Sequence, residues 1–94
     1  MSRGDLIARR ITLRGRVQGV GFRYFVLQHA QRLGVQGWVR NREDGDVEAY
    51  FEGESEAVEK LIGLVCRGPS FSHVTEVEQR PCPPQGAASF TIRH

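Results

Sequence analysis

The chain has 94 residues, of which 39% are hydrophobic and 26% are charged, and its formal net charge is +2. This length suits one compact domain over residues 1–94 and leaves no room for a second hydrophobic core. The longest nearly apolar run, residues 61–66, is far too short to span a bilayer, and the first residues lack the apolar core of a secretory signal. We therefore expect a cytoplasmic protein that does not associate with a membrane.

Charge is distributed unevenly along the chain. Residues 1–42 contain nine arginines and a single acidic residue, whereas residues 43–94 contain ten acidic and four basic residues. The basic half is predicted to attract anions, and both nucleic acid and a small anionic substrate would respond to such a field. The two cysteines, Cys66 and Cys82, do not make a disulfide framework. We expect both to remain thiols without a catalytic role.

Alternating apolar and polar residues over 6–14 predict a first strand, with Ile11 and Leu13 on one face. The string Gly-Arg-Val-Gln-Gly-Val-Gly-Phe-Arg follows at residues 15–23. Its three glycines leave little bulk and permit positive-φ turns, so successive N–H groups can converge on one ligand. A helix predicted from Phe22 adds unpaired N–H groups and the positive end of its dipole. We interpret the loop as a cradle for phosphate; the alternative is a tight strand-to-helix turn.

Arg23 falls in the first turn of this helix, where a cation is unfavourable for the helix dipole and where its guanidinium could hold a phosphate. Apolar residues recur at helical spacing from Phe22 to Leu33, and Gly34 is a natural C-terminal stop. The loop is not a Walker A motif, because no Gly-Lys-Ser/Thr follows. It is not a dinucleotide fingerprint either, because the third glycine of that motif would fall at Tyr24.

Residues 35–41 predict a second strand and residues 46–52 a third, joined by a hairpin turn at Asp44-Gly45. Acidic residues of the third strand would pair with basic residues of the second. A second helix is predicted from Ser55 to Cys66, because its apolar residues share one face.

A fourth strand is predicted around residues 74–80, and a short last strand over 90–92 follows a proline-rich stretch. The order strand, helix, strand, strand, helix, strand predicts an α+β ferredoxin-like βαββαβ sandwich. This fold has a four-stranded antiparallel sheet with both helices on one face. Strands one and two then run the same way on either side of strand three. The loop at 15–21 and Asn41 are therefore expected at one edge.

The residues expected at this edge include no paired carboxylates, no metal-ligand cluster and no nucleophile–base pair. Positive charge, backbone donors and a carboxamide can hold a phosphoryl group and orient water. Such a set suits a substrate with a good leaving group, such as the mixed anhydride of a carboxylic and a phosphoric acid.

Two motifs resemble those of the acylphosphatase family. The string at residues 15–23 resembles the family's phosphate loop at every position. The family's second motif resembles, at the right spacing, Gly37-Trp38-Val39-Arg40-Asn41, Asp44-Gly45 and Val47-Glu48. The resemblance extends to the last predicted strand. Ser70 and Ser72 depart from it, since the family commonly has proline and alanine there; we expect that connector to lie far from the loop.

The resemblance implies an enzyme that hydrolyses acyl phosphates to a carboxylate and inorganic phosphate without metal or cofactor. It implies that Arg23 binds the phosphoryl oxygens and that Asn41 orients the attacking water. Taken alone, Asn41 is more typical of a turn residue that ends a strand. Inorganic phosphate would be product and inhibitor, and we expect a monomer that binds no nucleic acid. Backbone amides of six residues would complete the phosphate cradle: Arg16, Val17, Gln18, Gly19, Val20 and Gly21.

Two other functions remain open at this stage. Ferredoxin-like sheets also serve as RNA-binding modules without enzymatic activity, and residues 19–26 faintly resemble their glycine-aromatic motif. That motif belongs on a central strand, whereas these residues open a helix; Trp38 and Tyr50 are nevertheless predicted on the open face. Acylphosphatase-like domains also begin larger carbamoyl-transfer proteins of hydrogenase maturation. The chain ends after its last strand and lacks zinc-finger cysteine pairs, which favours a stand-alone enzyme.

Overall fold

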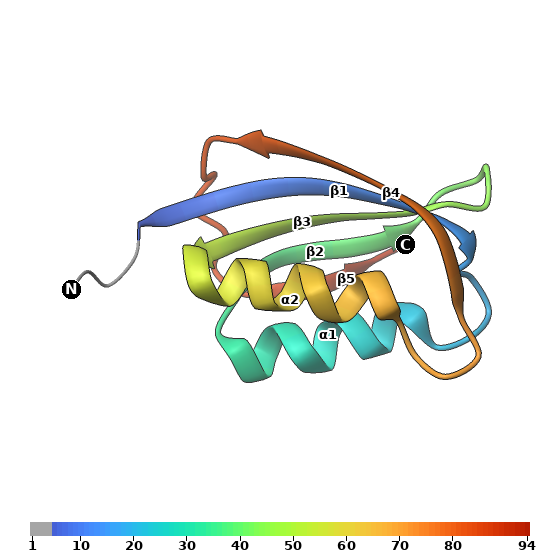
Figure 1. The fold of residues 1–94 in the computed structure, drawn as a ribbon. Helices are drawn as coiled ribbons and strands as arrows, with labels where there is room; N and C mark the ends of the chain where they lie inside the picture. Colours follow the sequence, from blue (N-terminus) through green and yellow to red (C-terminus); the bar gives the residue numbers. More distant parts are fainter. Residues whose placement is uncertain (1–4) are drawn as a thin grey trace.

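A computed structural model describes residues 5–94, and its elements follow the order that the sequence predicts (Figure 1). They are β1 (Leu6–Arg16), α1 (Phe22–Leu33), β2 (Gln36–Asn41), β3 (Val47–Glu54), α2 (Ser55–Arg67), β4 (His73–Cys82) and β5 (Phe90–Arg93). Both ends of α1 are as predicted, and Gly34 ends that helix in the left-handed conformation with φ 74°. Within the described residues, neither helix is long and apolar enough to cross a membrane.

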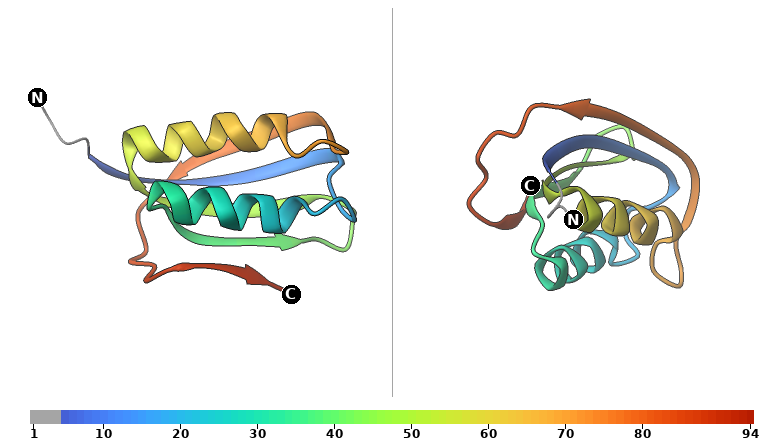
Figure 2. Two further views of the ribbon diagram at one scale, coloured as in Figure 1. Left: turned by 90° about the horizontal axis from the view of Figure 1, so that it is seen from below. Right: turned by 60° about the vertical axis from the view of Figure 1, so that its left-hand side comes forward.

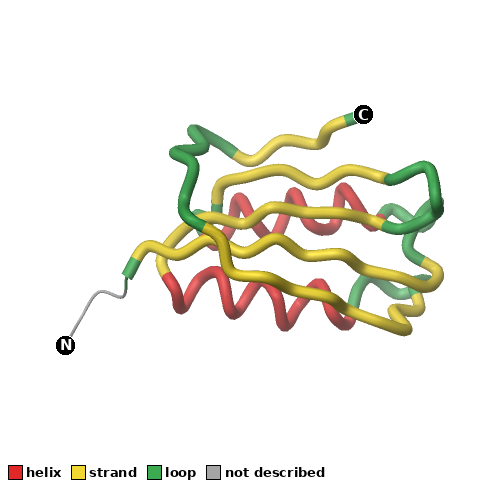
Figure 3. Tube along the Cα trace, turned by 90° about the horizontal axis from the view of Figure 1, so that it is seen from above, coloured by secondary structure: helices red, strands yellow, loops and turns green. Residues whose placement is uncertain are grey.

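Within the described residues the sheet has five strands in the order β4-β1-β3-β2-β5, one more than the four antiparallel strands that the sequence predicts. β1 pairs antiparallel with β3 and β4, and β2 pairs antiparallel with β3. β5 adds a parallel strand at the edge beside β2, with Val39 opposite Ile92 (Figure 3). A four-residue strand after a proline-rich stretch carries too little alternation to specify its partner, so the prediction missed this pairing.

β1 and β2 run in the same direction with β3 between them, as predicted. Their C-terminal ends therefore lie at the same end of the molecule. The connection from β1 to α1 and the hairpin from β2 to β3 both lie at that end, on the right in Figure 1. This arrangement brings residues 17–21 and Asn41 together.

Both helices cover one face of the sheet, and the other face is open (Figures 2 and 3). Strand residues whose side chains point toward the helices alternate with residues that point away, so a slip of one residue would exchange the two faces. The core between helices and sheet is built mainly from Ile11, Leu13, Phe22, Val26, Ala30, Val39, Val47, Ala49, Phe51, Val58, Leu61, Ile62, Val65 and Phe90. Burial of this apolar surface is the main force that holds the helices on the sheet.

Arginines and carboxylates pair across the open face. Glu48 on β3 accepts hydrogen bonds from Arg10 at 3.0 Å and from Arg40 at 2.7 Å. Arg14 pairs with Asp46 at 3.1 Å. Every salt bridge between described residues joins an arginine from residues 1–42 to a carboxylate from residues 43–94. The uneven charge of the sequence is thus largely neutralised by pairing, mostly across the sheet.

Candidate active site

Two glycines in the left-handed conformation shape the connection between β1 and α1. Gly19 has φ 75° and Gly21 has φ 76°, a region that strains any residue with a Cβ. Val17 is fully buried and anchors the start of the connection in the core. Left-handed residues of this kind turn neighbouring N–H groups toward one concavity, which is the usual geometry of an anion-binding turn.

The N-terminus of α1 carries no acidic side chain. Gly21 is the N-cap, no side chain caps the helix, and the first turn contains no aspartate or glutamate. The other helix, α2, has Glu56 in its first turn. Arg23 occupies the first turn of α1 instead, although a cation there opposes the helix dipole. The N-terminal N–H groups of α1 are therefore left to an anion from outside the chain.

The structure divides the six predicted cradle residues into two groups. Arg16 is the last residue of β1 and lies opposite His73 of β4. The Val17 N–H already donates to the Gly15 carbonyl at 3.1 Å. No acceptor among residues 5–94 pairs with the N–H groups of the other four residues, which are Gln18, Gly19, Val20 and Gly21.

The side chain of Gln18 ties this connection to the hairpin after β2. Its Nε2 donates to the carbonyl oxygen of Arg42 at 2.8 Å and to that of Asp46 at 2.9 Å. The sequence predicts only a backbone role for Gln18, because no linear pattern indicates which carbonyls a side-chain amide will reach. The two hydrogen bonds fix the connection relative to Asn41, which directly precedes Arg42.

Arg23 and Asn41 line the same hollow, whose volume is about 300 Å³. The residues around it are Val17, Gly19, Gly21, Phe22, Arg23, Tyr24, Asn41, Ile92 and His94. The topology predicts that the loop at 15–21 and Arg23 lie beside Asn41, and Gly19, Gly21, Arg23 and Asn41 all line this hollow. Ile92 and His94 were not predicted, because they reach the hollow only through the pairing of β5 with β2. Tyr24 was not predicted either, although its position beside Arg23 was a signal for it.

Two polar side chains of this hollow, Asn41 and Arg23, have atoms without a partner among residues 5–94. Asn41 Oδ1 is buried, and no donor within the described residues reaches it. Buried oxygens normally accept a hydrogen bond, so this one is suited to a donor from outside the chain. Arg23 forms no salt bridge within residues 5–94, and its Nη1 lies 3.5 Å from Nδ1 of His94. Its guanidinium therefore keeps most of its five donors for an anion.

The connector after α2 lies beside this site, so the expectation that it is far from the loop is wrong. Gly68 packs so closely on Phe22 that a Cβ on Gly68 would lie 2.9 Å from Cε2 of Phe22. Ser72, one of the two departures from the family pattern, donates through Oγ to the Pro69 carbonyl at 2.7 Å. That hydrogen bond closes the turn next to the first residue of α1.

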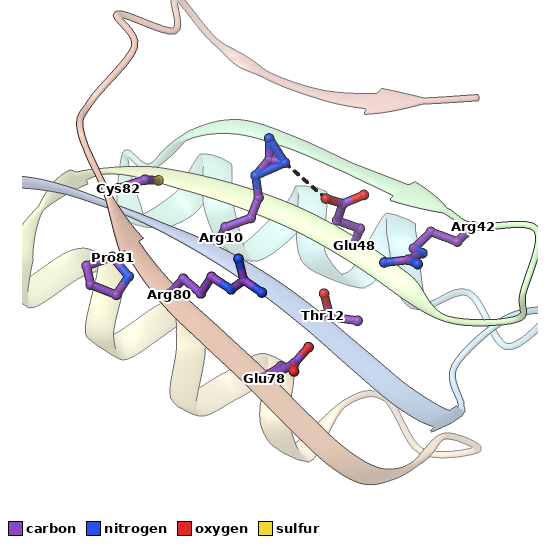
Figure 4. Close-up of a pocket in the computed structure, with 8 residues that line it drawn as sticks. All are labelled: Arg10, Thr12, Arg42, Glu48, Glu78, Arg80, Pro81 and Cys82. Carbon is purple, nitrogen blue, oxygen red and sulfur yellow. Dashed lines mark hydrogen bonds and ion pairs between the residues drawn. The ribbon is translucent and has the colours of Figure 1, made fainter.

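A second hollow, of about 420 Å³, lies on the open face of the sheet (Figure 4). It is lined by Arg10, Thr12, Arg42, Glu48, Glu78, Arg80, Pro81 and Cys82. Figure 4 shows Arg10 directed at Glu48, and Arg42 is paired with Asp44 at 3.0 Å. The charged side chains of this second hollow are therefore largely paired, whereas Arg23 has no acidic partner within the described residues. Across residues 5–94, no group of three or more His, Cys, Asp and Glu residues is placed to hold a metal ion.

The open face also disfavours the RNA-binding alternative. Trp38 is 8% exposed and Tyr50 is 1% exposed. The guanidinium of Arg93 lies 4.6 Å from the centre of the Trp38 ring. The Tyr50 hydroxyl donates to Glu52 and accepts from the N–H of Gln85. Because base stacking requires aromatic faces open to solvent, these two rings are closed to RNA.

Comparison with known proteins agrees with this geometry. The acylphosphatase family model matches residues 9–92. The chain belongs to the acylphosphatase family. It is 52% identical over 75 residues to an acylphosphatase of Nitrobacter winogradskyi, an alignment that covers 80% of this chain and 76% of that relative. The crystal structure of the acylphosphatase from Bacillus subtilis matches with a TM-score of 0.91 and 40% identity, over 94% of this chain and 99% of that one.

Membership of the acylphosphatase family makes the chain a hydrolase of acyl phosphates. The acylphosphatase fold also occurs inside a much longer protein. A crystal structure of full-length HypF, in a phosphate- and nucleotide-bound form, matches with a TM-score of 0.87 and 30% identity; it covers 99% of this chain and 12% of that one. The choice of a stand-alone enzyme over a carbamoyl-transfer protein stays a prediction.

Proposed function

We propose that the hollow shared by Arg23 and Asn41 hydrolyses acyl phosphates by holding the phosphoryl group and directing water onto phosphorus. The observation that carries this proposal is the complementary pair of unused groups in that hollow. The guanidinium of Arg23 has no acidic partner, and the buried Asn41 Oδ1 has no donor, within the described residues. A phosphoryl group would be the anion bound by the Arg23 guanidinium, and a water would be the donor to Asn41 Oδ1.

The phosphoryl oxygens would be held by Arg23 and by the N–H groups of residues 18–21. This cradle has fewer N–H groups than the six that the sequence predicts. The Val17 N–H donates to the Gly15 carbonyl instead, and Arg16 is part of β1. The N-terminus of α1 adds favourable dipole charge on the same side. Donors that are fixed in place before the substrate arrives stabilise charge in the transition state without further reorganisation.

The attacking water would donate one O–H to Asn41 Oδ1, which leaves an oxygen lone pair directed at phosphorus. As the new bond between water oxygen and phosphorus forms, the bond between phosphorus and the acyl oxygen breaks, and the carboxylate leaves with its electron pair. The surplus proton of the water passes to solvent. Because carboxylic acids have a pKa of about 4, this leaving group requires no general acid. Among the described residues that line the hollow of Arg23 and Asn41 there is no aspartate or glutamate, which is consistent with such a substrate.

The same proposal covers the remaining expectations for this protein. A small acyl phosphate is the substrate, and inorganic phosphate competes with it because both occupy the Arg23 cradle. We further propose a monomer that acts in the cytoplasm.

The division of labour between the two side chains is open to a direct test. Benzoyl phosphate hydrolysis and its inhibition by inorganic phosphate would be measured for wild type, Asn41→Ala and Arg23→Ala. Asn41→Ala is expected to lower kcat by about 10²–10³-fold, a loss typical of one removed catalytic hydrogen-bonding group, and to leave the phosphate inhibition constant within about twofold. Arg23→Ala is expected to weaken phosphate inhibition as well. Equal weakening of phosphate inhibition in both variants would contradict the proposal.

A further inference from the structure

The hollow of the proposed active site is larger and more apolar than a phosphoryl group requires. Its volume of about 300 Å³ lies at the low end of the range for small-molecule sites, roughly 300–1,000 Å³. Arg23, Asn41 and the glycines supply its polar side. Tyr24 on α1 and Ile92 on β5 supply apolar surface that the phosphoryl group does not use.

Tyr24 is exposed at a position where the fold does not require it. It is 59% exposed, and only two other large apolar residues within residues 5–94, Leu6 and Phe71, are exposed to a comparable degree. Neither Leu6 nor Phe71 lines the hollow. Tyr24 also directly follows Arg23 in the first turn of α1, so a ligand held by that guanidinium lies within reach of its ring. Partly exposed aromatic rings beside a polar anchor are typical of ligand contacts.

Ile92 approaches the hollow from another element. The parallel pairing of β5 with β2 places Ile92 opposite Val39, two residues before Asn41. Ile92 is half-buried and packs against the core with its remaining surface. Its position is fixed by backbone hydrogen bonds, so it offers a rigid apolar contact beside the proposed water site.

We infer that Tyr24 and Ile92 bind the acyl group of the substrate and give the enzyme a preference for acyl phosphates with an apolar, above all aromatic, acyl group. The inference rests on the proposed function, because it requires the phosphoryl group to sit at Arg23. With that end held, the acyl group must extend into the rest of the hollow, where Tyr24 and Ile92 are the accessible apolar surface. A benzoyl group would bury the exposed ring of Tyr24, whereas an acetyl group is too small to cover it.

The test compares kcat/KM for benzoyl phosphate and acetyl phosphate in wild type, Tyr24→Ala, Tyr24→Phe and Phe71→Ala. Phe71→Ala is the matched control, since it removes an exposed aromatic ring that does not line the hollow. Tyr24→Ala is expected to lower kcat/KM for benzoyl phosphate by about threefold to tenfold, the loss of one aromatic contact, and to change acetyl phosphate hydrolysis by less than about twofold. Tyr24→Phe and Phe71→Ala are expected to keep the wild-type ratio of the two substrates.

The outcomes separate the two proposals. Hydrolysis of both substrates with an unchanged ratio in Tyr24→Ala would overturn the acyl-group inference alone. Failure of the folded wild type to hydrolyse either substrate would overturn the proposed function and this inference with it. A loss confined to benzoyl phosphate is a readout that a purely structural role of Tyr24 would not produce.

Discussion

Gln18 Nε2 donates a hydrogen bond of 2.8 Å to the carbonyl oxygen of Arg42, the residue that directly follows Asn41. A second hydrogen bond, to the carbonyl of Asp46 at 2.9 Å, completes the contact with the hairpin. The loop that would hold the phosphoryl group and the residue that would orient water are thereby fixed to each other. This matters because displacements of about 1 Å in a catalytic arrangement can cost about 10²-fold in rate.

Replacement of Gln18 by alanine is expected to affect both stability and turnover. The loss of two hydrogen bonds should lower the free energy of unfolding by about 1–3 kcal/mol and reduce kcat/KM for benzoyl phosphate. Gln28→Ala, on the exposed side of α1, is the matched control and should change neither quantity appreciably. Urea unfolding and steady-state kinetics of the two variants provide the check. Wild-type activity in a destabilised Gln18→Ala protein would show that this contact does not position the site.

The two glycines that flank α1 allow backbone strain to be separated from function. Gly21 has φ 76° and Gly34 has φ 74°, and a Cβ at either position would meet no atom within 4 Å. Alanine should therefore destabilise the fold by a similar amount at both positions, about 1–2 kcal/mol, because both must hold the left-handed conformation. Only Gly21→Ala should reduce activity and phosphate inhibition, since Gly34 lies at the far end of the helix. Equal activity in the two variants, measured beside their thermal unfolding, would argue against a role for the Gly21 turn.

A substitution of Glu48 tests whether the open face of the sheet takes part in the reaction. Its carboxylate is largely buried and accepts hydrogen bonds from Arg10 and Arg40. Glu48→Gln should lower the free energy of unfolding by about 1–3 kcal/mol, because two arginines lose their shared charged partner. Benzoyl phosphate turnover measured below the unfolding transition should stay close to that of wild type. A marked fall in kcat in the folded variant would place the open face in the mechanism.

Glu52 should make stability depend on pH in the acidic range. Burial raises the pKa of its carboxyl, but hydrogen bonds from the Tyr50 hydroxyl and from the N–H groups of residues 85–87 outweigh burial and bring the pKa below its ordinary value of 4.5. A carboxyl with a lowered folded-state pKa stabilises the protein above its unfolded-state pKa, and this contribution is lost as pH falls through the folded-state pKa.

The measurement is urea unfolding of wild type and Glu52→Gln from about pH 6 down to about pH 3. The stability advantage of wild type should be constant at the upper end and should shrink as the pH falls below 4.5. Because residues 85–87 lead into β5, the loss should also loosen the strand that carries Ile92. A difference between the two proteins that does not vary with pH would contradict this role of Glu52.

Most secondary structure could be predicted from local patterns. The helical spacing from Phe22 to Leu33 and the left-handed stop at Gly34 gave both ends of α1, because these signals depend on neighbouring residues only. The parallel pairing of β5 could not be predicted in this way. It joins residues that lie more than fifty positions apart, and the four residues of β5 carry almost no pattern of their own.

The residues of the candidate site also differ in whether local sequence patterns could predict them. Arg23, the glycines and Asn41 belong to motifs that are continuous in sequence, and the strand order alone brings them to one end of the sheet. Ile92 and the side chain of Gln18 reach the site only through contacts that the folded chain creates, whereas Tyr24 directly follows Arg23 in the sequence. The uneven charge was also misleading as a guide to the site. Most arginines of the first half are paired with carboxylates of the second half, whereas Arg23 is not paired within the described residues.

The most direct test of the account is the hydrolysis of benzoyl phosphate, followed by absorbance in the presence of EDTA. Wild type would be compared with Arg23→Ala and with Arg32→Ala, which removes an exposed arginine from the other end of the same helix. We expect rapid turnover by wild type and by Arg32→Ala, and a loss of at least about 10²–10³-fold in Arg23→Ala, since charge stabilisation by that guanidinium is removed. Wild-type turnover in a folded Arg23→Ala protein would show that the reaction does not take place at this loop.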